Sequence, residues 1–545
     1  MFSFNLSLSF IVVLLSLLLS YIFVALNNNS DIKMGKNGLL FVSNAAKAHN
    51  YCLKASQFVQ KVLYIKINEN SLNTLPLLSS QISNIYTRTS SYSKLDVRLI
   101  IKPVDTVKNI RTYHPIDLLL YDNELSSEIE KLKKSVESLK TDYRIQSIEQ
   151  DGKLETLNQE PVKQYEYVAL GGTFDRLHNG HKILLSQAVL RATKHVTVGV
   201  TDVNMIQYKH FITAKKLFEL IEPTETRIKA VLDFLTDINP DLEYNVLPIH
   251  DLYGPTKDDP KFQLIVVSEE TQRGAQKINE KRKENGLPLL DTYVIGLAQD
   301  SSPQRSQEEE EKVSSSNQRM RLLGTMLRPP VENNNIPAWP YVIGLAGGIA
   351  SGKSNIAEKL RLKGAAIVNC DTIAHDLYKP GLPLNQTVAE AFGSEIITDS
   401  GEVDRRKLGQ IVFSDKEELE KLNRLVWPAV IEEAQRRVQA LGQEGYRVVV
   451  MEAAVMVRAK WYNQCHQLWA VIIPPEEAIK RLQERNGLTE EEARQRIESQ
   501  PSNREQVSLA NIVFSPYWSY EYTQMQIDRA WQHLQELLDS RTCNC

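Results

Sequence analysis

The chain has 545 residues, of which 42% are hydrophobic and 24% are charged, as is usual for soluble globular proteins. One hydrophobic core rarely organises so many residues, so we expect about three or four domains. The net charge of −3 argues against a nucleic-acid-binding protein, because such a protein presents a basic face. The five cysteines show no paired zinc-ligand spacing, so we expect reduced thiols in a reducing compartment.

The chain begins with an apolar segment, residues 1–33. Residues 2–26 carry no charge and are rich in Leu, Ile and Val. About 20 apolar residues span a bilayer, so this segment is a candidate membrane anchor. A cleaved secretory signal is the rival interpretation, although the segment lacks a basic start and a clear small-residue cleavage site. In a third interpretation translation begins at Met34 and the segment has no role.

Residues 34–150 form a mixed region with strand-like runs at 62–67 and 97–101. We find no catalytic group of residues there, and the role of the region is open. In residues 124–140 the apolar side chains recur at alternating four- and three-residue spacing, which predicts an amphipathic helix. The polar run 141–163 predicts a linker.

Strands and helices alternate in the rest of the chain. A predicted helix at 180–193 lies among predicted strands at 167–170, 195–200, 264–267 and 292–297. After a linker at 329–340, rich in Pro and Asn, a second series follows with predicted strands at 341–346, 366–369, 447–451 and 469–473. This alternation predicts an α/β fold with two tandem parallel-sheet domains, at 160–328 and 341–540. The acidic run 308–311 predicts a solvated loop, and we see no internal sequence repeat.

The first predicted strand of this series leads into the motif Thr173-Phe174-Asp175-Arg176-Leu177-His178-Asn179-Gly180-His181. The N–H groups and the dipole at a helix start favour a phosphate. His178 and His181 can donate to phosphate oxygens and offset charge that develops in a transition state. Gly180 allows a ligand to approach the backbone closely. Two surface histidines at a helix start are the alternative interpretation.

This motif resembles that of the HxGH nucleotidyltransferase superfamily. Near residue 315 the segment Lys312-Val313-Ser314-Ser315-Ser316-Asn317-Gln318-Arg319 resembles the late serine motif of the same superfamily, which lies at a helix N-terminus and holds ATP phosphates. Residues 267–275 resemble a motif of eukaryotic-type phosphopantetheine adenylyltransferases, in which Arg273 would face phosphate. Lys215 resembles the mobile lysine of that family; Lys216 is an alternative, and an ordinary surface lysine is another.

The resemblance implies a direct in-line reaction in which the phosphate of 4′-phosphopantetheine attacks the α-phosphorus of ATP. Positioning and charge stabilisation would carry the rate, without a protein nucleophile. It implies His181, His178 and Lys215 as catalytic residues. The implied ATP-binding residues of this domain are Thr173, Phe174, Gly180, Arg273, Ser314, Ser315, Ser316 and Arg319.

The second motif is a P-loop, Gly347-Gly348-Ile349-Ala350-Ser351-Gly352-Lys353-Ser354, placed between a predicted strand and a helix. Its backbone amides are expected to cradle the β- and γ-phosphates of ATP, Lys353 to neutralise them, and Ser354 to bind Mg²⁺. Asp371 follows the next strand and can accept a proton from a substrate hydroxyl, with a helix cap as the alternative. Arginines at 481–485 and 494–496 suit a phosphate-clamping lid or a solvated helix face.

This second arrangement resembles the dephospho-coenzyme A kinases. The resemblance implies Asp371 as the base for the ribose 3′-hydroxyl, Arg405 and Arg496 as substrate-binding residues, and Arg485 as an ATP-binding residue. The sequence departs from the family at Glu452, where Asp is common, and at Arg458, where an acidic residue is frequent. The late Asn of bacterial relatives is also absent near 513–516, which leaves the substrate-side contacts in doubt.

The two domains in tandem resemble the bifunctional coenzyme A synthases. The resemblance implies that 4′-phosphopantetheine and ATP give dephospho-coenzyme A, which a second ATP converts to coenzyme A, in the cytoplasm, at mitochondria, or both. One competing interpretation is nucleotidyl transfer to another phosphorylated metabolite. Another is a membrane-tethered scaffold with degenerate sites, against which the intact motif residues argue. Oligomeric state, feedback and substrate channelling cannot be read from the sequence.

Overall fold

The computed structural model describes residues 34–68, 74–91, 95–101, 110–149, 161–202, 215–302 and 305–542. The chain divides into two compact units. The first comprises Met1–Asp202, Thr224–Arg305 and Glu311–Val313, and the second comprises Val203–Pro223, Ser306–Glu310 and Ser314–Cys545. The apolar segment 1–33 lies outside the described residues, and none of the helices within them is long and apolar enough to cross a bilayer.

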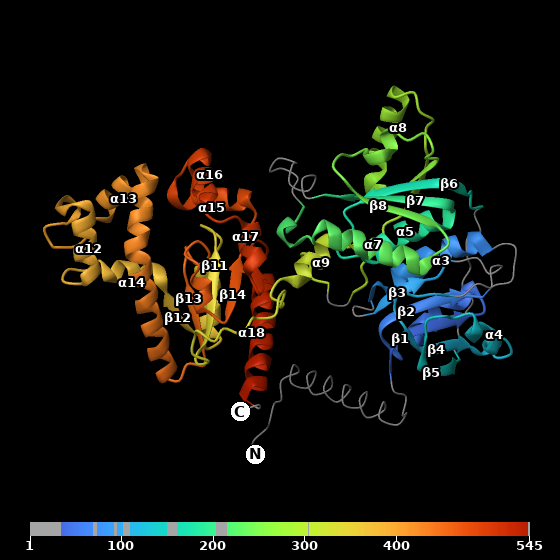
Figure 1. Cartoon of the computed structure of the whole chain (residues 1–545), viewed down its shortest axis with the longest axis horizontal. Helices are drawn as coiled ribbons and strands as arrows, with labels where there is room; N and C mark the ends of the chain where they lie inside the picture. Colours follow the sequence, from blue (N-terminus) through green and yellow to red (C-terminus); the bar gives the residue numbers. More distant parts are fainter. Residues whose placement is uncertain are drawn as a thin grey trace, which may run out of the picture. The chain divides into compact units, whose positions relative to one another are not determined.

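The first unit contains two parallel sheets (Figure 1). The N-terminal sheet has the order β3-β2-β1-β4-β5, from β1 (Gly35–Val42), β2 (Val59–Ile67), β3 (Asp96–Leu99), β4 (Ile116–Asp122) and β5 (Leu139–Ile148). Its connections include α2 (Ala48–Ala55), α3 (Thr74–Arg88) and α4 (Ile129–Lys134), and the short 3-10 helices η1 (Ala45–Lys47), η2 (Thr89–Ser91) and η3 (Asn123–Leu125). The mixed N-terminal region is therefore a parallel-sheet fold of its own.

The predicted helix at 124–140 is wrong, and so is the linker prediction for 141–148. Only α4 is α-helical, and β5 begins at Leu139. The apolar residues of this stretch do share one core, but η3, α4 and β5 each contribute some of them. Most residues of β5 are exposed or half-buried at the edge of the sheet, so its sequence is polar and lacks the signature of a buried strand.

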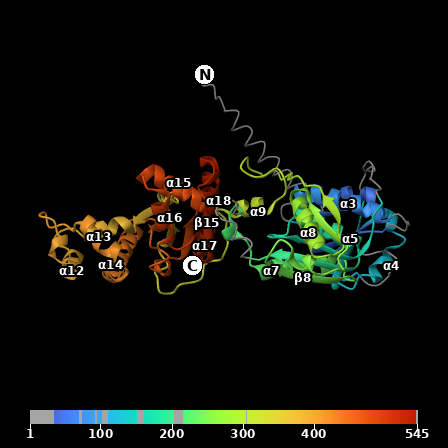
Figure 2. The ribbon, with the colours of Figure 1, turned by 90° about the horizontal axis from the view of Figure 1, so that it is seen from above.

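The second sheet has the order β10-β9-β6-β7-β8. Its strands are β6 (Tyr165–Gly172), β7 (Ala192–Thr201), β8 (Glu243–Ile249), β9 (Leu264–Ser268) and β10 (Asp291–Ile295). Its connections include α5 (Asn179–Arg191), α7 (Thr224–Ile238) and α8 (Gln272–Glu284), with η5 (Gly254–Lys257) and η6 (Glu269–Thr271). Both sheets of the unit contribute to one continuous apolar core, and α3 lies beside α5 (Figures 1 and 2).

The second unit is built on a third parallel sheet of order β12-β13-β11-β14-β15, so the predicted tandem α/β architecture is confirmed. Its strands are β11 (Tyr341–Gly347), β12 (Ala366–Asn369), β13 (Val448–Glu452), β14 (Gln467–Val471) and β15 (Ile512–Phe514). Helices α10 (Lys353–Leu362), α11 (Cys370–Leu377), α12 (Pro383–Phe392), α13 (Arg405–Ser414) and α14 (Lys416–Gln443) precede β14, together with η7 (Ser394–Ile396) and η8 (Trp461–Gln464). Helices α15 (Pro475–Asn486), α16 (Glu490–Glu498), α17 (Asn503–Leu509) and α18 (Tyr520–Thr542) follow it.

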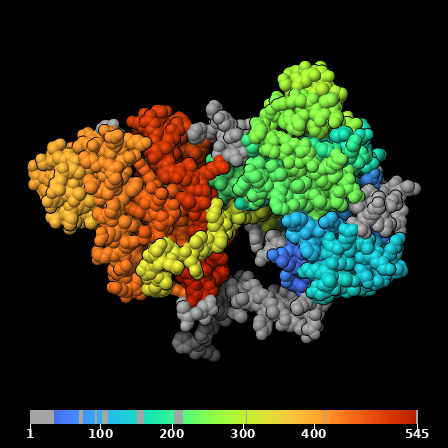
Figure 3. Space-filling model, in the orientation of Figure 1, coloured from blue at the N-terminus to red at the C-terminus, as the bar shows by residue number. Residues whose placement is uncertain are grey.

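Segments that precede the third sheet in sequence complete its core. Leu220 of η4 (Phe218–Leu220), Met320 of α9 (Ser315–Leu322) and Leu323 are buried against residues of β14, α17 and β15. Glu309 is also buried and pairs with Arg321 at 2.5 Å, so the prediction of a solvated loop at 308–311 is wrong for this residue. The linker 329–340 runs over the surface of the second unit (yellow in Figure 3), where Trp339 Nε1 donates to the Gly442 carbonyl at 3.4 Å.

Candidate active sites

The first motif lies at the carboxyl end of β6, where the backbone turns into α5. Phe174 is fully buried with φ of 50°, and its ring lies 5.2 Å from the His181 ring. A Cβ atom at Gly172 would lie 3.1 Å from the Phe174 ring, so the Gly-Gly turn leaves room for this side chain. The buried Phe174 ring therefore packs against the His181 ring.

The two histidines of the motif stand side by side at the start of α5. Their ring centroids are 3.8 Å apart and their planes differ by 22°. His178 is the N-cap residue, and a Cβ atom at Gly180 would come within 3.1 Å of its ring. Any larger residue at position 180 would displace the ring. Two imidazoles beside the N–H groups of a helix start form a site suited to phosphate oxygens.

A buried arginine that the sequence interpretation missed fixes the edge of this site. Arg227 of α7 is fully buried, and its Nη1 donates to the carbonyls of Thr173 at 2.6 Å and Thr201 at 2.9 Å. It therefore joins the ends of β6 and β7. Arg227 lies four residues before the buried Val231, so helical periodicity carries a signal for its burial. Without that periodicity, an arginine at the polar start of a helix would be predicted to lie on the surface.

The predicted serine motif lies at the start of α9, as the resemblance implies. Ser314 is the N-cap residue, and its hydroxyl accepts from the Asn317 N–H at 3.2 Å. Arg319 is buried; its Nε donates to the Lys216 carbonyl at 2.8 Å, and its Nη2 reaches Ser316 Oγ at 3.4 Å. Within the second unit the structure thus brings together the serine motif, Arg319 and the backbone beside Lys215.

Other predicted residues of this site lie in the first unit. Arg273 is an exposed residue in the first turn of α8. Val313 precedes Ser314 in sequence, and its carbonyl lies 3.7 Å from the position of a Cβ atom at Gly180. Val313, which belongs to the first unit, thus lies beside the histidine motif. A shared phosphate site for these residues and Lys215 stays a prediction.

The P-loop joins β11 to α10 and forms the floor of a cavity of about 690 Å³. Gly352 has φ of 91°, which favours glycine. A Cβ atom at Gly347 would lie 2.7 Å from Ser351 Oγ and 2.8 Å from the Val471 carbonyl. Among the described residues, Ser351 Oγ is buried without a hydrogen-bond partner. The loop therefore has the shape and the donors that a nucleotide phosphate requires.

A carboxylate lies directly behind this loop. Ser354 Oγ donates to Glu452 Oε1 at 2.8 Å, and Asn369 Nδ2 donates to Glu452 Oε2 at 3.3 Å. Lys353 Nζ donates to the Gly347 carbonyl at 2.9 Å. Burial lowers the pKa of Lys353, while Asp371 and Glu452 oppose that shift. Glu452, noted in the sequence as a departure, thus holds the serine predicted to bind Mg²⁺.

Asp371 is hydrogen-bonded to a residue that lines the same cavity. It is an exposed residue in the first turn of α11, and its carboxylate accepts from the Ala454 N–H at 3.3 Å. Ala454 lines the cavity. The N-cap of α11 is Asn369, whose Oδ1 accepts from the Thr372 N–H at 3.1 Å. The alternative interpretation of Asp371 as the helix cap is therefore wrong, and the side chain is available to a substrate.

The predicted lid corresponds to α15 and α16. Arg485 lines the cavity, as does Arg481, whose Nη1 donates to the Ala350 carbonyl at 3.3 Å and Nη2 to the Pro516 carbonyl at 2.9 Å. The Ile349 N–H donates to Gln500 Oε1 at 2.7 Å. The sequence analysis included Arg481 among the lid arginines without giving it a binding role, and it did not name Gln500. Arg405, at the start of α13, and Arg496, on α16, are exposed and do not line this cavity, so their substrate contacts stay predictions.

Two family models match the chain. Residues 341–516 match the model described as dephospho-CoA kinase, and residues 169–321 match the model described as cytidylyltransferase-like. The dephospho-CoA kinase of Carboxydothermus hydrogenoformans is 40% identical over 186 residues, which cover 34% of this chain and 90% of that protein. The dephospho-CoA kinase of Syntrophus aciditrophicus is 38% identical over 193 residues, or 35% of this chain and 82% of that protein.

Solved structures cover similar shares of the chain. TT1252 from Thermus thermophilus is 29% identical and matches 36% of this chain and 98% of its own, with a TM-score of 0.31. The dephospho-CoA kinase from Campylobacter jejuni is 23% identical and matches 36% of this chain and 97% of its own, with a TM-score of 0.30. Identity of 40% across 90% of a curated relative is decisive. The chain belongs to the dephospho-CoA kinase family and carries a cytidylyltransferase-like domain before its kinase domain.

Proposed function

We propose that the chain catalyses the last two steps of coenzyme A biosynthesis. The observation that carries this proposal is the presence of two phosphate sites on one chain whose kinase part is 40% identical to a dephospho-CoA kinase. One is the histidine pair at α5, within the cytidylyltransferase-like match, and the other is the P-loop at α10. The product of a phosphopantetheine adenylyltransferase is the substrate of this kinase.

In the first reaction a phosphate oxygen of 4′-phosphopantetheine forms a bond to the α-phosphorus of ATP, and the bond to the leaving pyrophosphate breaks. His178 and His181 donate to the phosphate oxygens on which negative charge increases. Phe174 and Gly180 hold the two rings in place, and Arg227 holds the strand ends. Lys215, Arg273 and the residues of the serine motif complete the proposed ATP contacts.

In the second reaction Asp371 accepts the proton of the ribose 3′-hydroxyl while that oxygen attacks the γ-phosphorus of ATP and ADP leaves. Lys353, Arg481 and Arg485 face the cavity and neutralise phosphate charge. The hydroxyl of Ser354 and the carboxylate of Glu452 are hard oxygen donors that suit Mg²⁺, which when bound neutralises the β- and γ-phosphates. Glu452 orients Ser354 for that role.

The decisive assay uses the full chain with ATP, Mg²⁺ and 4′-phosphopantetheine, and resolves the products by mass. We expect coenzyme A to form through dephospho-coenzyme A. His181→Ala should stop the first product but leave phosphorylation of added dephospho-coenzyme A intact, and Lys353→Ala should do the reverse. Each variant is therefore the control for the other.

Other outcomes of that assay point elsewhere. Pyrophosphate release only with a different phosphorylated acceptor would replace the first half of the proposal. Coenzyme A formation by Lys353→Ala, or full adenylyl transfer by His181→Ala, would contradict the site assignments. Absence of ATP binding by both units would favour a scaffold.

The proposed location is the cytoplasm, the mitochondrial surface, or both, with residues 2–26 as the anchor and the catalytic part facing the ATP pool. The support is the uncharged apolar composition of that segment. Fractionation of cells that express the full chain or a chain starting at Met34 tests this. Equal partition of both forms into the soluble fraction would contradict an anchor.

A further inference from the structure

The N-terminal region has the same strand order as the domain that follows it. Counted along the chain, both sheets of the first unit place their strands in the order third, second, first, fourth, fifth, and all neighbours are parallel. In each sheet the first strand leads through a short turn to a helix, α2 in one and α5 in the other. The first unit is thus a structural repeat that the sequence does not reveal.

The N-terminal copy lacks the phosphate site of its partner. Counted from the N-cap of each helix, Lys47, His49 and Asn50 of the N-terminal copy occupy the positions of His178, Gly180 and His181. At the carboxyl end of its sheet Asp122 accepts from Ser43 Oγ and, at 2.8 Å, from Tyr51 Oη. A carboxylate in this place repels a phosphate group.

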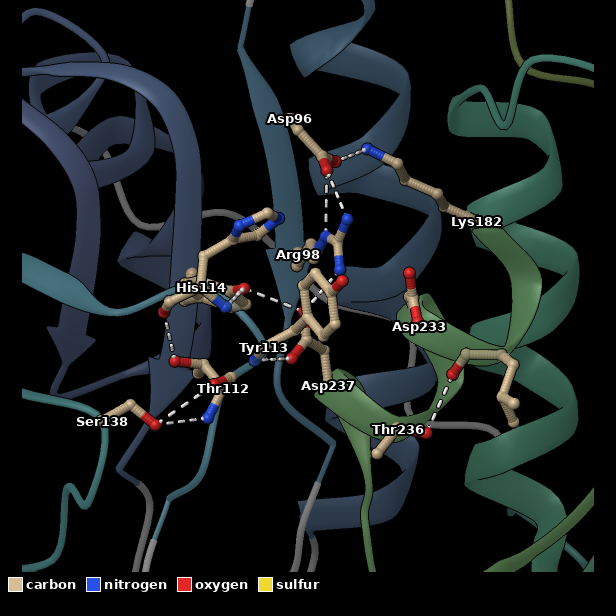
Figure 4. A network of polar contacts seen from close by, with 12 residues as sticks. Asp96, Arg98, Thr112, Tyr113, His114, Ser138, Lys182, Asp233, Thr236 and Asp237 are labelled. Carbon is tan, nitrogen blue, oxygen red and sulfur yellow. Dashed lines mark hydrogen bonds and ion pairs between the residues drawn. The ribbon is translucent and has the colours of Figure 1, made fainter. Parts of the chain in front are cut away.

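Charged side chains join the two copies through a buried network (Figure 4). Arg98 of β3 pairs with Asp96 on its own strand at 2.7 Å and with Asp237 of α7. Tyr64 Oη donates to the same Asp237 carboxylate at 2.8 Å. Burial raises the pKa of Asp96, but Lys182 and Arg98 outweigh that effect and hold it at about 2. Asp96 is therefore a carboxylate throughout the physiological pH range.

The network ends on the helix turn that carries the catalytic histidines. Lys182, the residue after His181, is only 5% exposed; its Nζ contacts the Asp96 carboxylate and donates to the Val97 carbonyl at 3.0 Å. Asn179 Nδ2 donates to the Tyr86 carbonyl at 2.7 Å and to Thr89 Oγ1 at 3.2 Å. The N-terminal copy thus holds residues 179 and 182, on either side of His181.

We propose that Asp96 and Thr89 of the N-terminal copy are positioning residues for the adenylyl transfer, because they fix the first turn of α5 and with it the His178 and His181 rings. The proposal rests on the function proposed for this site. Displacement of a catalytic group by about 1 Å can lower a rate about 100-fold. The N-terminal region then contributes to adenylyl transfer by positioning the catalytic histidines, without contacting the substrates.

The test is Asp96→Asn in the full chain, assayed for both reactions. We expect kcat of adenylyl transfer to fall about 10- to 100-fold with KM for both substrates within about twofold, because the rings move while the substrate pocket remains. Phosphorylation of dephospho-coenzyme A by the same molecules should be unchanged. Asp96→Glu, which can still reach Lys182, should recover much of the rate.

The matched control is Asp117→Asn. Asp117 of β4 also pairs with a lysine, Lys140 at 3.2 Å, and accepts from the Asn37 N–H at 3.0 Å, but these partners belong to the N-terminal copy itself. Both reactions should keep their wild-type rates. An equal loss of adenylyl transfer in Asp117→Asn would show that any weakening of this copy lowers the rate, and would overturn the proposal.

If Asp96→Asn does not fold, Thr89→Val decides, because it keeps the side-chain shape but removes the acceptor for Asn179 and the hydrogen bond that Thr89 Oγ1 donates to the Ile85 carbonyl at 2.8 Å. A fall of kcat by several-fold supports positioning, and an unchanged kcat overturns it. An effect of Asp96→Asn on KM alone, or failure of Asp96→Glu to recover any rate, also overturns it. If the wild-type chain itself does not adenylylate 4′-phosphopantetheine, the proposed function fails instead.

Discussion

Outside the P-loop, Glu452 makes the contacts that position the proposed Mg²⁺ ligand of the second site. Its two oxygens accept from Ser354 at 2.8 Å and Asn369 at 3.3 Å, so it ties the start of α10 to the end of β12. The carboxylate is only 4% exposed. A second carboxylate, Asp371, lies near the same lysine, and both counteract the effect of burial on Lys353. Replacing one carboxylate oxygen of Glu452 by an amide nitrogen should therefore change the rate of the kinase reaction and leave adenylyl transfer unaffected.

We expect Glu452→Gln to lower kinase activity about 10- to 100-fold, the usual effect of losing a group that orients a metal ligand. The Mg²⁺ concentration for half-maximal rate should rise, and adenylyl transfer should not change. A Mg²⁺ titration of dephospho-coenzyme A phosphorylation measures this. Glu358→Gln, an exposed residue of α10 paired with Arg361 at 2.7 Å, is the control. An unchanged Mg²⁺ dependence in Glu452→Gln would contradict the assigned role.

Lys353 should lower the stability of the ligand-free kinase unit. Burial holds its pKa below the ordinary 10.5. Above pH 10.5 the amine is neutral in both the folded and the unfolded chain, so the destabilisation develops as the pH falls from 10.5 to the lowered folded-state pKa, and it is complete below that pKa. At pH 7 we therefore expect Lys353→Met to raise the melting temperature by a few degrees while it abolishes kinase activity. Calorimetry measures this, with exposed Lys480→Met as the control, and a lower melting temperature would contradict it.

The residues that sequence reasoning found are neighbours along the chain. The histidine motif and the P-loop each occupy one strand-to-helix turn, so spacing alone defines them. Arg227, Arg481 and Gln500 reach their sites from other elements, so the spacing of the two motifs does not point to them. Glu452 stood out only because it differs from its family, and its role required the hydrogen bond to Ser354.

At the scale of elements, three helix starts carry the proposed chemistry. The N-cap residues of α5, α9 and α10 are His178, Ser314 and Gly352, and each helix start presents N–H groups to a phosphate motif. The capping of these helices therefore bears on binding as well as on stability. Only α9 among them uses a side-chain cap to the following turn.

Ser314→Ala should raise KM for ATP in adenylyl transfer several-fold. Loss of an N-cap costs about 0.5–2 kcal/mol and frays the turn that holds Ser315 and Ser316. Initial rates of pyrophosphate release at varied ATP measure this. Ser502→Ala removes the cap of α17, where Ser502 Oγ accepts from the Glu505 N–H at 3.2 Å, and should leave this KM unchanged. Equal KM values for Ser314→Ala and wild type would contradict a phosphate role for α9.

Most of the strands that the sequence predicts are buried, although the predicted strand at 292–297 corresponds to β10, an edge strand with two exposed residues. β7, β9, β11 and β13 read as apolar runs because helices or loops cover both faces. β5 and β8 lie at sheet edges and have many exposed positions, and β8 also contains Pro248, so neither shows a strand pattern. The repeat within the first unit is a match of strand order, which depends on how the strands pair and leaves no mark in the residue pattern.

At the scale of the whole molecule, the N-terminal region and the first catalytic domain share one core. The ring centroids of Tyr86 and Phe234 lie 6.5 Å apart, and the Ile101 N–H donates to the Ile238 carbonyl at 2.8 Å. Phe234 and Ile238 are fully buried, as is Val231 on the same helix. These contacts make the N-terminal region part of the folding unit.

A chain that starts at residue 161 should therefore lose adenylyl transfer and expose the apolar face of α7, while its kinase activity remains. We expect it to bind a hydrophobic dye and to elute partly as aggregates, unlike a chain that starts at Met34. Size-exclusion chromatography with both assays measures this. Full adenylyl transfer by a monomeric chain starting at 161 would contradict the shared core.

The packing of Leu220, Met320 and Leu323 among the residues of the third sheet has a consequence for the history of the gene. Two separate genes can join in a single event. The reverse event, a break at the linker 329–340, would leave these side chains on one product and their apolar cavity on the other. We therefore expect that separate expression of the two halves, divided at this linker, would leave apolar surface exposed on both products.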